Sequence, residues 1–413
     1  MTDKDYRLEK DSMGELKVPG EKHWGAQTQR AIENFKISNI KMPSEFIQSL
    51  ALLKWALSAA NSELGLLSSD KSEAIGRIAL EISEGNHHDE FPVDVFQTGS
   101  GTSTNMNMNE VIAHLSSSDD IPIHPNDDVN MGQSSNDVIP SAINVAASVL
   151  IKSSLLGSLS HLQKTLEEKA SSLSDVVKTG RTHLMDAMPI TFGQEIGAWA
   201  SQIEEAKRQF EATLPKMQHL AIGGTAVGTG VNSHPDLSEK VSQLLNQKTG
   251  LNFQPSTDLF KAISSQDGSL ELSSNARNLA VALIKIANDL RWMNSGPLAG
   301  LGEISLPPLQ PGSSIMPGKV NPVIPESVLM VAAQVIGNDA TIVLAAQSGN
   351  FQLNVMLPVI AFNLIQSVSL LSNACMALAD KAIKDFEVNQ ENIDLVINNN
   401  PILATALNDT IGY

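Results

Sequence analysis

Residues 311–322 combine side chains that can bind an anion with side chains that can move a proton. The polar side chains in and just after this stretch are Ser313, Ser314, Lys319, Asn321 and Glu326. Its glycines allow hinge motion, its prolines restrain the backbone, and its ammonium and amide groups can donate hydrogen bonds to a carboxylate. The pattern favours a loop that closes over an anionic substrate. A proline-rich linker with an incidental lysine would have the same composition.

Two further segments carry clustered hydrogen-bond donors. Residues 97–105 read Gln-Thr-Gly-Ser-Gly-Thr-Ser-Thr-Asn, and around Ser100, Gly101 and Thr102 the backbone can approach a ligand closely. Taken alone, this is also the composition of a plain turn. Residues 133–137 read Gln-Ser-Ser-Asn-Asp and precede an apolar helical pattern. Their side chains either cap that helix or hold an anion at its positive end, and the spacing leaves both interpretations open.

Two segments place a histidine among polar residues. Residues 180–184 read Gly-Arg-Thr-His-Leu, which predicts a short polar turn between two helical stretches. An imidazole suits acid–base work near neutral pH, but a lone histidine such as His183 more often serves structure. Residues 124–128 read His-Pro-Asn-Asp-Asp and form the second such cluster.

Helical periodicity dominates the elements that must position these segments. Helical patterns cover residues 137–169, 191–214, 279–293, 326–346 and 355–379. The pattern at 279–293 is apolar nearly all round, so we expect neighbouring helices to enclose it. Strand patterns are scarce. The sequence therefore predicts an all-α fold built on an up-and-down bundle of five long helices. The predicted domains are residues 1–132, 133–391 and a short tail, 392–413.

Charge and cysteine usage exclude several classes of protein. Lysine and arginine total 28 against 45 for aspartate and glutamate, so the net charge is 28 − 45 = −17. This charge repels nucleic-acid phosphates and anionic membranes, so we expect neither as a partner. The single cysteine, Cys375, excludes internal disulfides, a cysteine zinc site and an iron–sulfur cluster held by one chain.

The sequence also predicts a cytoplasmic location. A lone cysteine suits a reducing compartment, and residues 1–9 are charged, with no apolar segment of the kind that targets secretion. Residues 340–379 carry no charge, as a membrane span would, but several amide side chains and Pro358 interrupt them. We interpret this stretch as buried bundle helix.

Together these motifs resemble the fumarase/aspartase superfamily over the whole chain. Residues 312–322 (Gly-Ser-Ser-Ile-Met-Pro-Gly-Lys-Val-Asn-Pro) are close to its signature G-S-x-x-M-P-x-K-x-N-P, and further matches run from residues 10–14 and 24–30 to 411–413. The finer motifs are similar to class II fumarases rather than aspartases. The deciding positions are His183, where aspartases have glutamine, together with Ser100, Ser135 and Gly318. The sequence departs from the class II fumarase pattern at Leu298 and at residues 323–326.

The resemblance implies fold and assembly. It implies a helical N-terminal domain, a central five-helix bundle, and a homotetramer in which four chains form a twenty-helix core. Each active site then draws on three subunits. Related chains continue for some tens of residues beyond the position of Tyr413 into a small C-terminal domain. We therefore expect residues 392–413 to be the remnant of a domain that this sequence mostly lacks.

The resemblance also implies an activity: reversible hydration of fumarate to (S)-malate in the tricarboxylic acid cycle, through an aci-carboxylate intermediate and without metal or cofactor. Ser313 would be the base that takes the C3 proton, and His183, paired with Glu326, the acid. The implied substrate-binding residues are Ser100, Gly101, Thr102, Ser134, Ser135, Asn136, Thr182, Ser314, Lys319, Val320 and Asn321. The residues that match a second dicarboxylate site are His124, Pro125, Asn126 and Asp127. Aspartase and a catalytically silent protein of the same fold are the alternatives.

Overall fold

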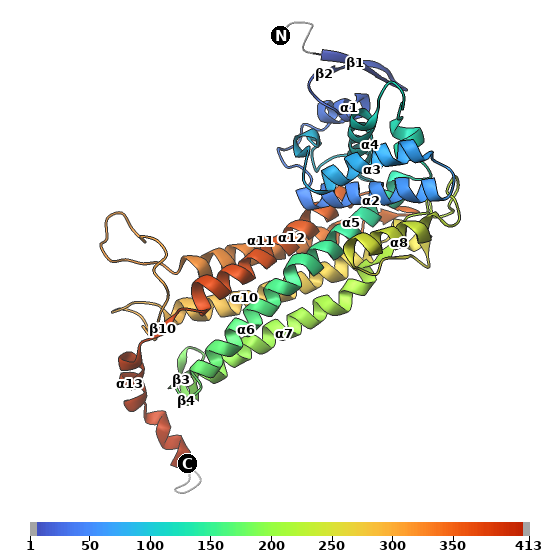
Figure 1. Cartoon of the computed structure of the whole chain (residues 1–413). Helices are drawn as coiled ribbons and strands as arrows, with labels where there is room; N and C mark the ends of the chain where they lie inside the picture. The colour runs from blue at the N-terminus through green and yellow to red at the C-terminus, as the bar shows by residue number, and fades with distance from the viewer. Residues whose placement is uncertain (1–5, 408–413) are drawn as a thin grey trace. The chain divides into compact units, whose positions relative to one another are not determined.

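The computed structural model describes residues 6–407 (Figure 1). Expectations that concern residues 1–5 and 408–413, including the match at 411–413, lie outside the described residues. Most of the described chain is helical, which confirms the predicted all-α class. The sequence pattern predicted few strands, and the strands of residues 6–407 are short and form five two-stranded sheets.

The long helices predicted from the sequence are all present within residues 6–407. They are α5 (Ser135–Leu150) followed by α6 (Leu156–Ser172), α7 (Phe192–Met217), α10 (Asp267–Met293), α11 (Val323–Ala346) and α12 (Leu357–Leu378) (Figure 1). A π-helical turn, Ile151–Leu155, joins α5 to α6 in one continuous helical stretch, Ser135–Ser172, as the pattern predicted. The uncharged stretch 340–379 is not one helix, because a small hairpin, β8 (Gly349–Asn350) and β9 (Leu353–Asn354), divides it between α11 and α12.

Helix α10 contributes buried apolar side chains to the core, although the single chain does not cover every side of this helix. Leu279, Leu283 and Ile286 are fully buried, as the alternation of three- and four-residue steps predicts. Val281 on the same helix is 55% exposed, so the expectation that neighbours enclose this helix is not met within one chain.

Three helical stretches of the described chain are long and apolar enough to cross a membrane, by length and composition alone. They are Ser135–Ser172, Val323–Ala346 and Leu357–Ile383. The most apolar 18 residues of Ser135–Ser172 are 56% buried inside the structure, and those of Leu357–Ile383 are 61% buried. Those of Val323–Ala346 are only 39% buried, so this helix is the least covered of the three.

The chain divides into two compact units, each made of separate stretches of sequence. The first comprises Met1–Ser153, Ala212–Ser274 and Gly337–Val368, and the second comprises Ser154–Glu211, Asn275–Ile336 and Ser369–Tyr413. The predicted domains are consecutive segments instead, and that partition stays a prediction.

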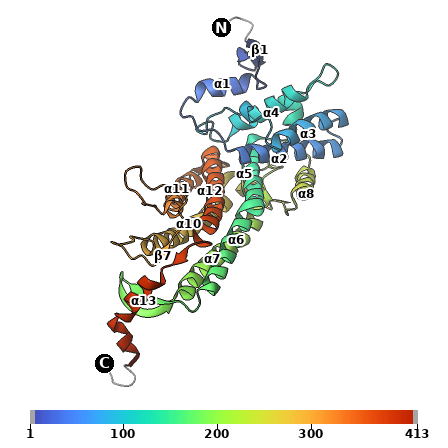
Figure 2. The same ribbon diagram turned by 60° about the vertical axis from the view of Figure 1, so that its left-hand side comes forward.

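The first unit contains the N-terminal elements. In order these are β1 (Tyr6–Asp11), β2 (Gly14–Pro19), α1 (Ala26–Asn34), α2 (Ser44–Glu63), α3 (Ser69–Ser83), the 3-10 turn His88–Glu90, α4 (Thr102–Ser116) and the π-helical turn Pro125–Val129. Later elements are β5 (His219–Leu220), α8 (Leu237–Thr249), β6 (Gln254–Pro255) and α9 (Leu259–Ser264). Helices α2 and α3 lie side by side, as Figure 2 also shows, and α2 packs against α5 and α8. Phe46, Leu50 and Leu57 of α2 are fully buried in this core.

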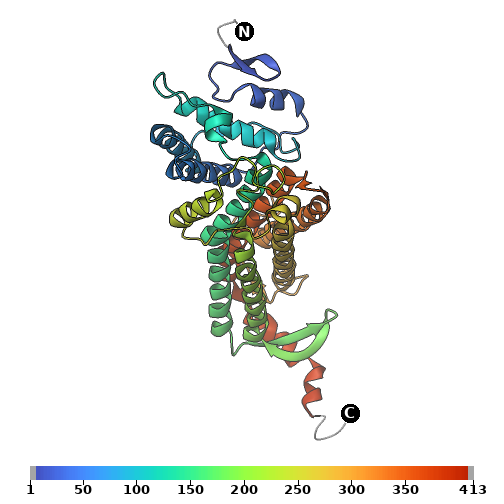
Figure 3. The same ribbon diagram turned by 90° about the vertical axis from the view of Figure 1, so that its right-hand side faces the viewer.

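The second unit contains the elements that carry the histidine turn and the signature loop. They are the antiparallel hairpin of β3 (Val177–Thr182) and β4 (Met185–Thr191), drawn as paired arrows in Figure 3, and β7 (Ile304–Ser305), which pairs with β10 (Glu387–Val388). The π-helical turn Ala379–Ile383, α13 (Gln390–Asn398) and the 3-10 segment Pro401–Leu407 follow. Inside this unit the hydroxyls of Ser154 and Ser158 both hydrogen-bond Ser372 of α12.

Candidate active site

The loop between β7 and α11 is closed at its base by backbone and amide hydrogen bonds. The N–H of Gly312 donates to the carbonyl oxygen of Lys319 at 2.9 Å, and Nδ2 of Asn321 donates to the carbonyl oxygen of Gly312 at 3.1 Å. A Cβ at residue 312 would lie 2.4 Å from the Lys319 carbonyl oxygen, so only glycine fits there. The arrangement holds the two ends of the loop together.

The hydroxyl of Ser313 lies where backbone donors converge. Its Oγ accepts hydrogen bonds from the N–H groups of Ile315 and Met316, each at 3.3 Å. Hydrogen bonds donated to an oxygen stabilise its negatively charged form, so this geometry favours the alkoxide of Ser313, which is the form that can accept a proton. Ser313 itself is half-buried, whereas Ser314 and Lys319 are exposed in the single chain.

The end of the loop and the end of α10 line an open cavity of about 420 Å³. Lys319, Val320, Asn321 and Glu326, all predicted site residues, line it. The other lining residues are Arg291, Trp292, Asn294, Ser295, Gly296 and Pro322. The sequence reasoning missed Arg291. A cation in the last turn of a helix is ordinary, because it complements the helix dipole, so the pattern alone carries no signal of a binding role.

Residues 180–184 form part of a β-hairpin, which corrects the prediction of a turn between two helices. His183 and Leu184 are the two residues of the hairpin turn, with φ of 56° and 62°. Positive φ at both central residues is the geometry of the two-residue turns that match strand twist. The sequence did not predict this hairpin, because Gly180 and Pro189 interrupt the two-residue alternation that is typical of strands. Thr182 and His183 are exposed.

A buried ionic network holds the base of this hairpin. Lys178 of β3 is 1% exposed, and its Nζ lies 2.7 Å from Glu195 and 2.8 Å from Glu303. The other oxygen of Glu303 lies 2.6 Å from Nη2 of Arg181, the residue before Thr182. Within residues 6–407, no hydrogen bond or ion pair joins Thr182 or His183 to the loop at 312–321 or to Glu326.

In the first unit, a glycine lets the segment before α4 pack closely against Ile139 of α5, whereas its approach to a ligand stays a prediction. Gly101 is the N-cap residue of α4 with φ of 73°, and a Cβ there would lie 2.9 Å from the side chain of Ile139. The hydroxyls of Ser100 and Thr102 are 2.7 Å apart. Ser100 is buried, and Thr102 opens the helix. The N-terminus of α4 therefore lies beside two hydroxyls, although the N–H of Thr104 in its first turn already donates to Oε1 of Gln97 at 2.9 Å.

Of the two interpretations left open for residues 133–137, the structure shows the cap of α5. Oγ of Ser134 accepts from the N–H of Asn136 at 3.2 Å, and the carboxylate of Asp137 accepts from the N–H of Ser134 at 2.9 Å. These are the two halves of a capping box. Ser135 accepts from Asn105 at 3.3 Å, and the amide of Asn136 donates to the carbonyl oxygen of Ala226 at 2.8 Å. The structure thus brings the Ser135 hydroxyl to α4 through Asn105.

A buried lysine, which the sequence reasoning missed, supports this region. Lys54 of α2 is fully buried, and its Nζ donates to the side-chain oxygens of Asn130 at 3.1 Å and Gln133 at 2.7 Å. Burial lowers the pKa of Lys54 to about 7, against the opposing charge of Asp137. Burial likewise raises the pKa of Asp137 to about 7, although N–H donors from Ser134 and elsewhere oppose that shift.

The proposed second dicarboxylate segment is a solvent-exposed turn. Nδ1 of His124 accepts from the N–H groups of Asn126 at 3.3 Å and Asp127 at 3.1 Å, so the imidazole caps the π-helical turn that Pro125 begins. The carboxylate of Asp127 lies 3.2 Å from the same nitrogen. The carboxylate of Asp128, the next residue in the sequence, forms an ion pair with Nζ of Lys71 at 2.8 Å.

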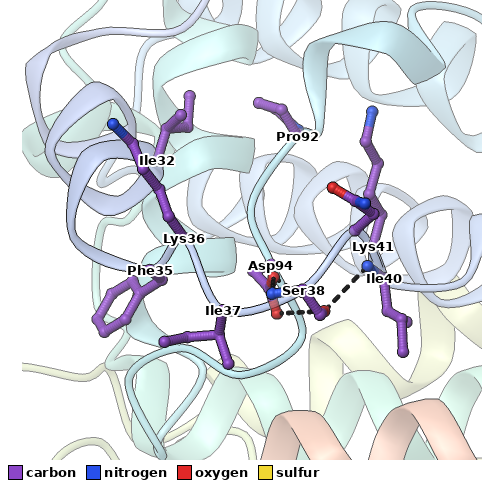
Figure 4. Close-up of a pocket in the computed structure, with 10 residues that line it drawn as sticks. Ile32, Phe35, Lys36, Ile37, Ser38, Ile40, Lys41, Pro92 and Asp94 are labelled. Carbon is purple, nitrogen blue, oxygen red and sulfur yellow. Dashed lines mark hydrogen bonds between the residues drawn. The ribbon is translucent and has the colours of Figure 1, made fainter.

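Another cavity, of about 440 Å³, lies in the first unit and contains none of the predicted residues (Figure 4). Lys36 and Lys41 line it together with Ser38 and Asp94, and the hydroxyl of Ser38 donates to the Asp94 carboxylate. Separately, within residues 6–407 no group of three or more histidine, cysteine, aspartate or glutamate side chains is placed to hold a metal ion.

Comparison with known proteins gives relatives along the whole chain. A family model described as Lyase matches residues 14–337. A class II fumarate hydratase of Xylella fastidiosa is 56% identical over 409 residues, which cover 99% of this chain and 86% of the relative. A second, from Pseudomonas aeruginosa, is 56% identical over 410 residues, covering 99% of this chain and 90% of the relative. Among solved structures, a class II fumarase from Schistosoma mansoni matches with a TM-score of 0.96 at 40% identity, covering 99% of this chain and 90% of that one.

Proposed function

Because this chain belongs to the lyase family and its relatives are class II fumarate hydratases, it is a hydro-lyase that adds water to fumarate, and we propose that Ser313 moves the proton. The reverse reaction removes water from malate. The observation that carries the proposal is the position of the Ser313 oxygen, which accepts from two N–H groups in the loop that also bears Lys319 and Asn321.

Removal of the C3 proton of malate is the difficult step, because that carbon acid is very weak. The alkoxide form of Ser313, which the two N–H donors stabilise, takes this proton on Oγ and becomes the neutral hydroxyl. The electron pair of the broken C–H bond is delocalised into the neighbouring carboxylate to give an aci-carboxylate. The ammonium of Lys319 and the amide of Asn321 would stabilise the charge that accumulates there. The two N–H groups at Ser313 support its role as base, because an unperturbed hydroxyl is too weak for this work.

The second half of the dehydration needs an acid. We propose that His183, paired with Glu326, protonates the hydroxyl that leaves C2, so that water departs and fumarate forms. The exposed position of His183 at the tip of its hairpin supports a site completed by another copy of the chain. The groups proposed to orient the rest of the substrate are Ser100, Gly101, Thr102, Ser134, Ser135, Asn136, Thr182, Ser314 and Val320. The turn at His124, Pro125, Asn126 and Asp127 is proposed as a second dicarboxylate site.

We propose a homotetramer with shared active sites as the working assembly. Exposed apolar side chains on bundle helices support it: Val281 is 55%, Met330 68% and Leu344 61% exposed in the single chain. Apolar surface of this kind on helices that also build the core is typical of obligate interfaces. The least-covered apolar stretch, α11, belongs to that surface.

A cytoplasmic location and a place in the tricarboxylic acid cycle belong to the same proposal. The one cysteine, Cys375, is buried, and burial raises the pKa of its thiol to about 12, so it stays an unreactive thiol. Bacterial relatives with the same enzymatic name support the metabolic role.

An ultraviolet assay for fumarate tests the function. Purified protein is mixed with (S)-malate or with aspartate, and the absorbance of the conjugated product is followed. We expect fumarate to form from malate and not from aspartate. Formation from aspartate alone would make the protein an aspartase, and formation from neither would leave a silent protein of this fold.

A further inference from the structure

We propose that Arg291 binds the substrate, as a second cation that engages the dicarboxylate held by Lys319 and Asn321. The proposal rests on the proposed function and extends it to a residue at the end of α10. That residue lies outside the signature loop and the other motifs that the sequence singled out.

The first step of the argument is shared geometry. Arg291 lines the same cavity of about 420 Å³ as Lys319, Asn321 and Glu326. Neighbouring side chains fix the end of α10 at this cavity. The Asn294 side chain accepts from the N–H of Leu306 at 2.8 Å, and the Ser295 hydroxyl accepts from the N–H of Leu301 at 2.9 Å. The segment that carries Arg291 is therefore held in place by backbone contacts.

The second step is that the charge of Arg291 is not used elsewhere. Its Nη1 donates to the amide oxygen of Asn288 at 3.1 Å. Within residues 6–407, no carboxylate forms an ion pair with Arg291 or Lys319. A guanidinium has five N–H donors, so most of those on Arg291 have no acceptor among the described residues. The cavity is lined by two cations and one carboxylate, Glu326, in a protein of net charge −17.

The third step is the charge of the ligand. Fumarate and malate carry two carboxylates at opposite ends of a four-carbon chain, and Lys319 can neutralise only one of them. A guanidinium matches the second, because its planar donors pair with a carboxylate at two points. An acidic protein also repels a dianion at long range, so a second local cation raises the concentration of substrate at the site.

Steady-state kinetics of Arg291→Gln, Arg291→Lys and a matched control test the proposal. Lys285→Gln removes the same charge from the same helix, at a residue that pairs with Asp289 and does not line the cavity. We expect Arg291→Gln to raise KM for malate about tenfold to a hundredfold with a smaller change in kcat, in line with the loss of a charge-assisted hydrogen bond. Arg291→Lys should recover part of the loss, and Lys285→Gln should stay within about twofold of the wild type.

Binding of succinate, an unreactive four-carbon dicarboxylate, separates this inference from the proposed function. Isothermal titration calorimetry measures this binding without turnover, and Trp292, which lines the same cavity and is 53% exposed, should add a change to the fluorescence of the four tryptophans. Weaker succinate binding by Arg291→Gln, with unchanged assembly in size-exclusion chromatography, supports the proposal. Wild-type affinity in that variant, or a loss of affinity that accompanies dissociation of the oligomer, overturns it. A wild-type protein that binds succinate but does not convert malate would instead refute the proposed function.

Discussion

The guanidinium of Arg181 lies 2.6 Å from the carboxylate of Glu303, and the second oxygen of that carboxylate lies 2.8 Å from the buried ammonium of Lys178. Arg181 immediately precedes Thr182 and His183 at the tip of the hairpin. Glu303 lies next to β7, before the signature loop begins. One carboxylate therefore links the strand that carries the proposed acid to the segment that leads into the loop with the proposed base.

Replacing Glu303 with glutamine should destabilise the protein strongly. The change leaves Arg181 without its paired charge and Lys178 with Glu195 alone, and breaking a buried pair in this way costs about 3 kcal/mol. Chemical denaturation measures the free energy of unfolding. Glu205→Gln, which removes a surface partner of Arg208, is the control and should cost less than about 1 kcal/mol. Equal effects of the two changes would contradict the structural role given to Glu303.

Ser313→Ala should lower kcat by roughly 10²-fold or more, as expected for loss of a general base. The side chain is half-buried in a loop, and its oxygen contacts only local N–H groups, so the fold should be unaffected. Stopped-flow or steady-state assay of malate dehydration, with circular dichroism as the folding control, measures this. Wild-type turnover in the variant would remove Ser313 from the mechanism.

His183→Asn should give a loss of kcat of similar size, roughly 10²-fold, with the oligomer intact. Asparagine tolerates the left-handed φ of 56° at this turn position, so the hairpin should keep its geometry. Kinetics and analytical ultracentrifugation of the same preparation separate the two effects. Activity lost only in step with dissociation would assign His183 a structural role in place of an acid–base role.

The buried Lys54 should make the stability of the protein depend on pH. Burial lowers its pKa from 10.5 to about 7, so between those values the unfolded chain binds more protons at this residue than the folded chain does. The free energy of unfolding of the wild type, measured relative to that of Lys54→Met, should therefore rise with pH between these two values. The rise should be at most about 1.4 kcal/mol per pH unit. Urea denaturation of both proteins from pH 7 to pH 10 measures the difference. A difference that stays flat or falls would show that Lys54 remains charged when buried.

Long helices were predictable because their apolar periodicity extends over many turns, as in α10, where Leu279, Leu283 and Ile286 are buried as expected. The Ser134 cap was predictable because it depends on residues adjacent in sequence. The β3–β4 hairpin was not, since Gly180 and Pro189 break its alternation.

The supporting residues of the site were harder to predict. Lys54 sits in an apolar helix, where a single lysine usually reaches solvent, and its burial depends on amide acceptors about 80 residues away. Arg291 and Glu303 depend on contacts between segments distant in sequence, which no local pattern encodes. The proposed catalytic residues Ser313 and His183 were found through the superfamily motifs rather than through spacing.

Proton nuclear magnetic resonance of fumarate incubated with the purified protein in D₂O tests the central claim most directly. Addition of water across the double bond should place one deuterium on C3 and give monodeuterated malate, with no added metal or coenzyme, and Ser313→Ala should slow its appearance by roughly 10²-fold. Fumarate that stays unchanged in D₂O, or that is consumed only when ammonia is present and then yields aspartate, would contradict the account.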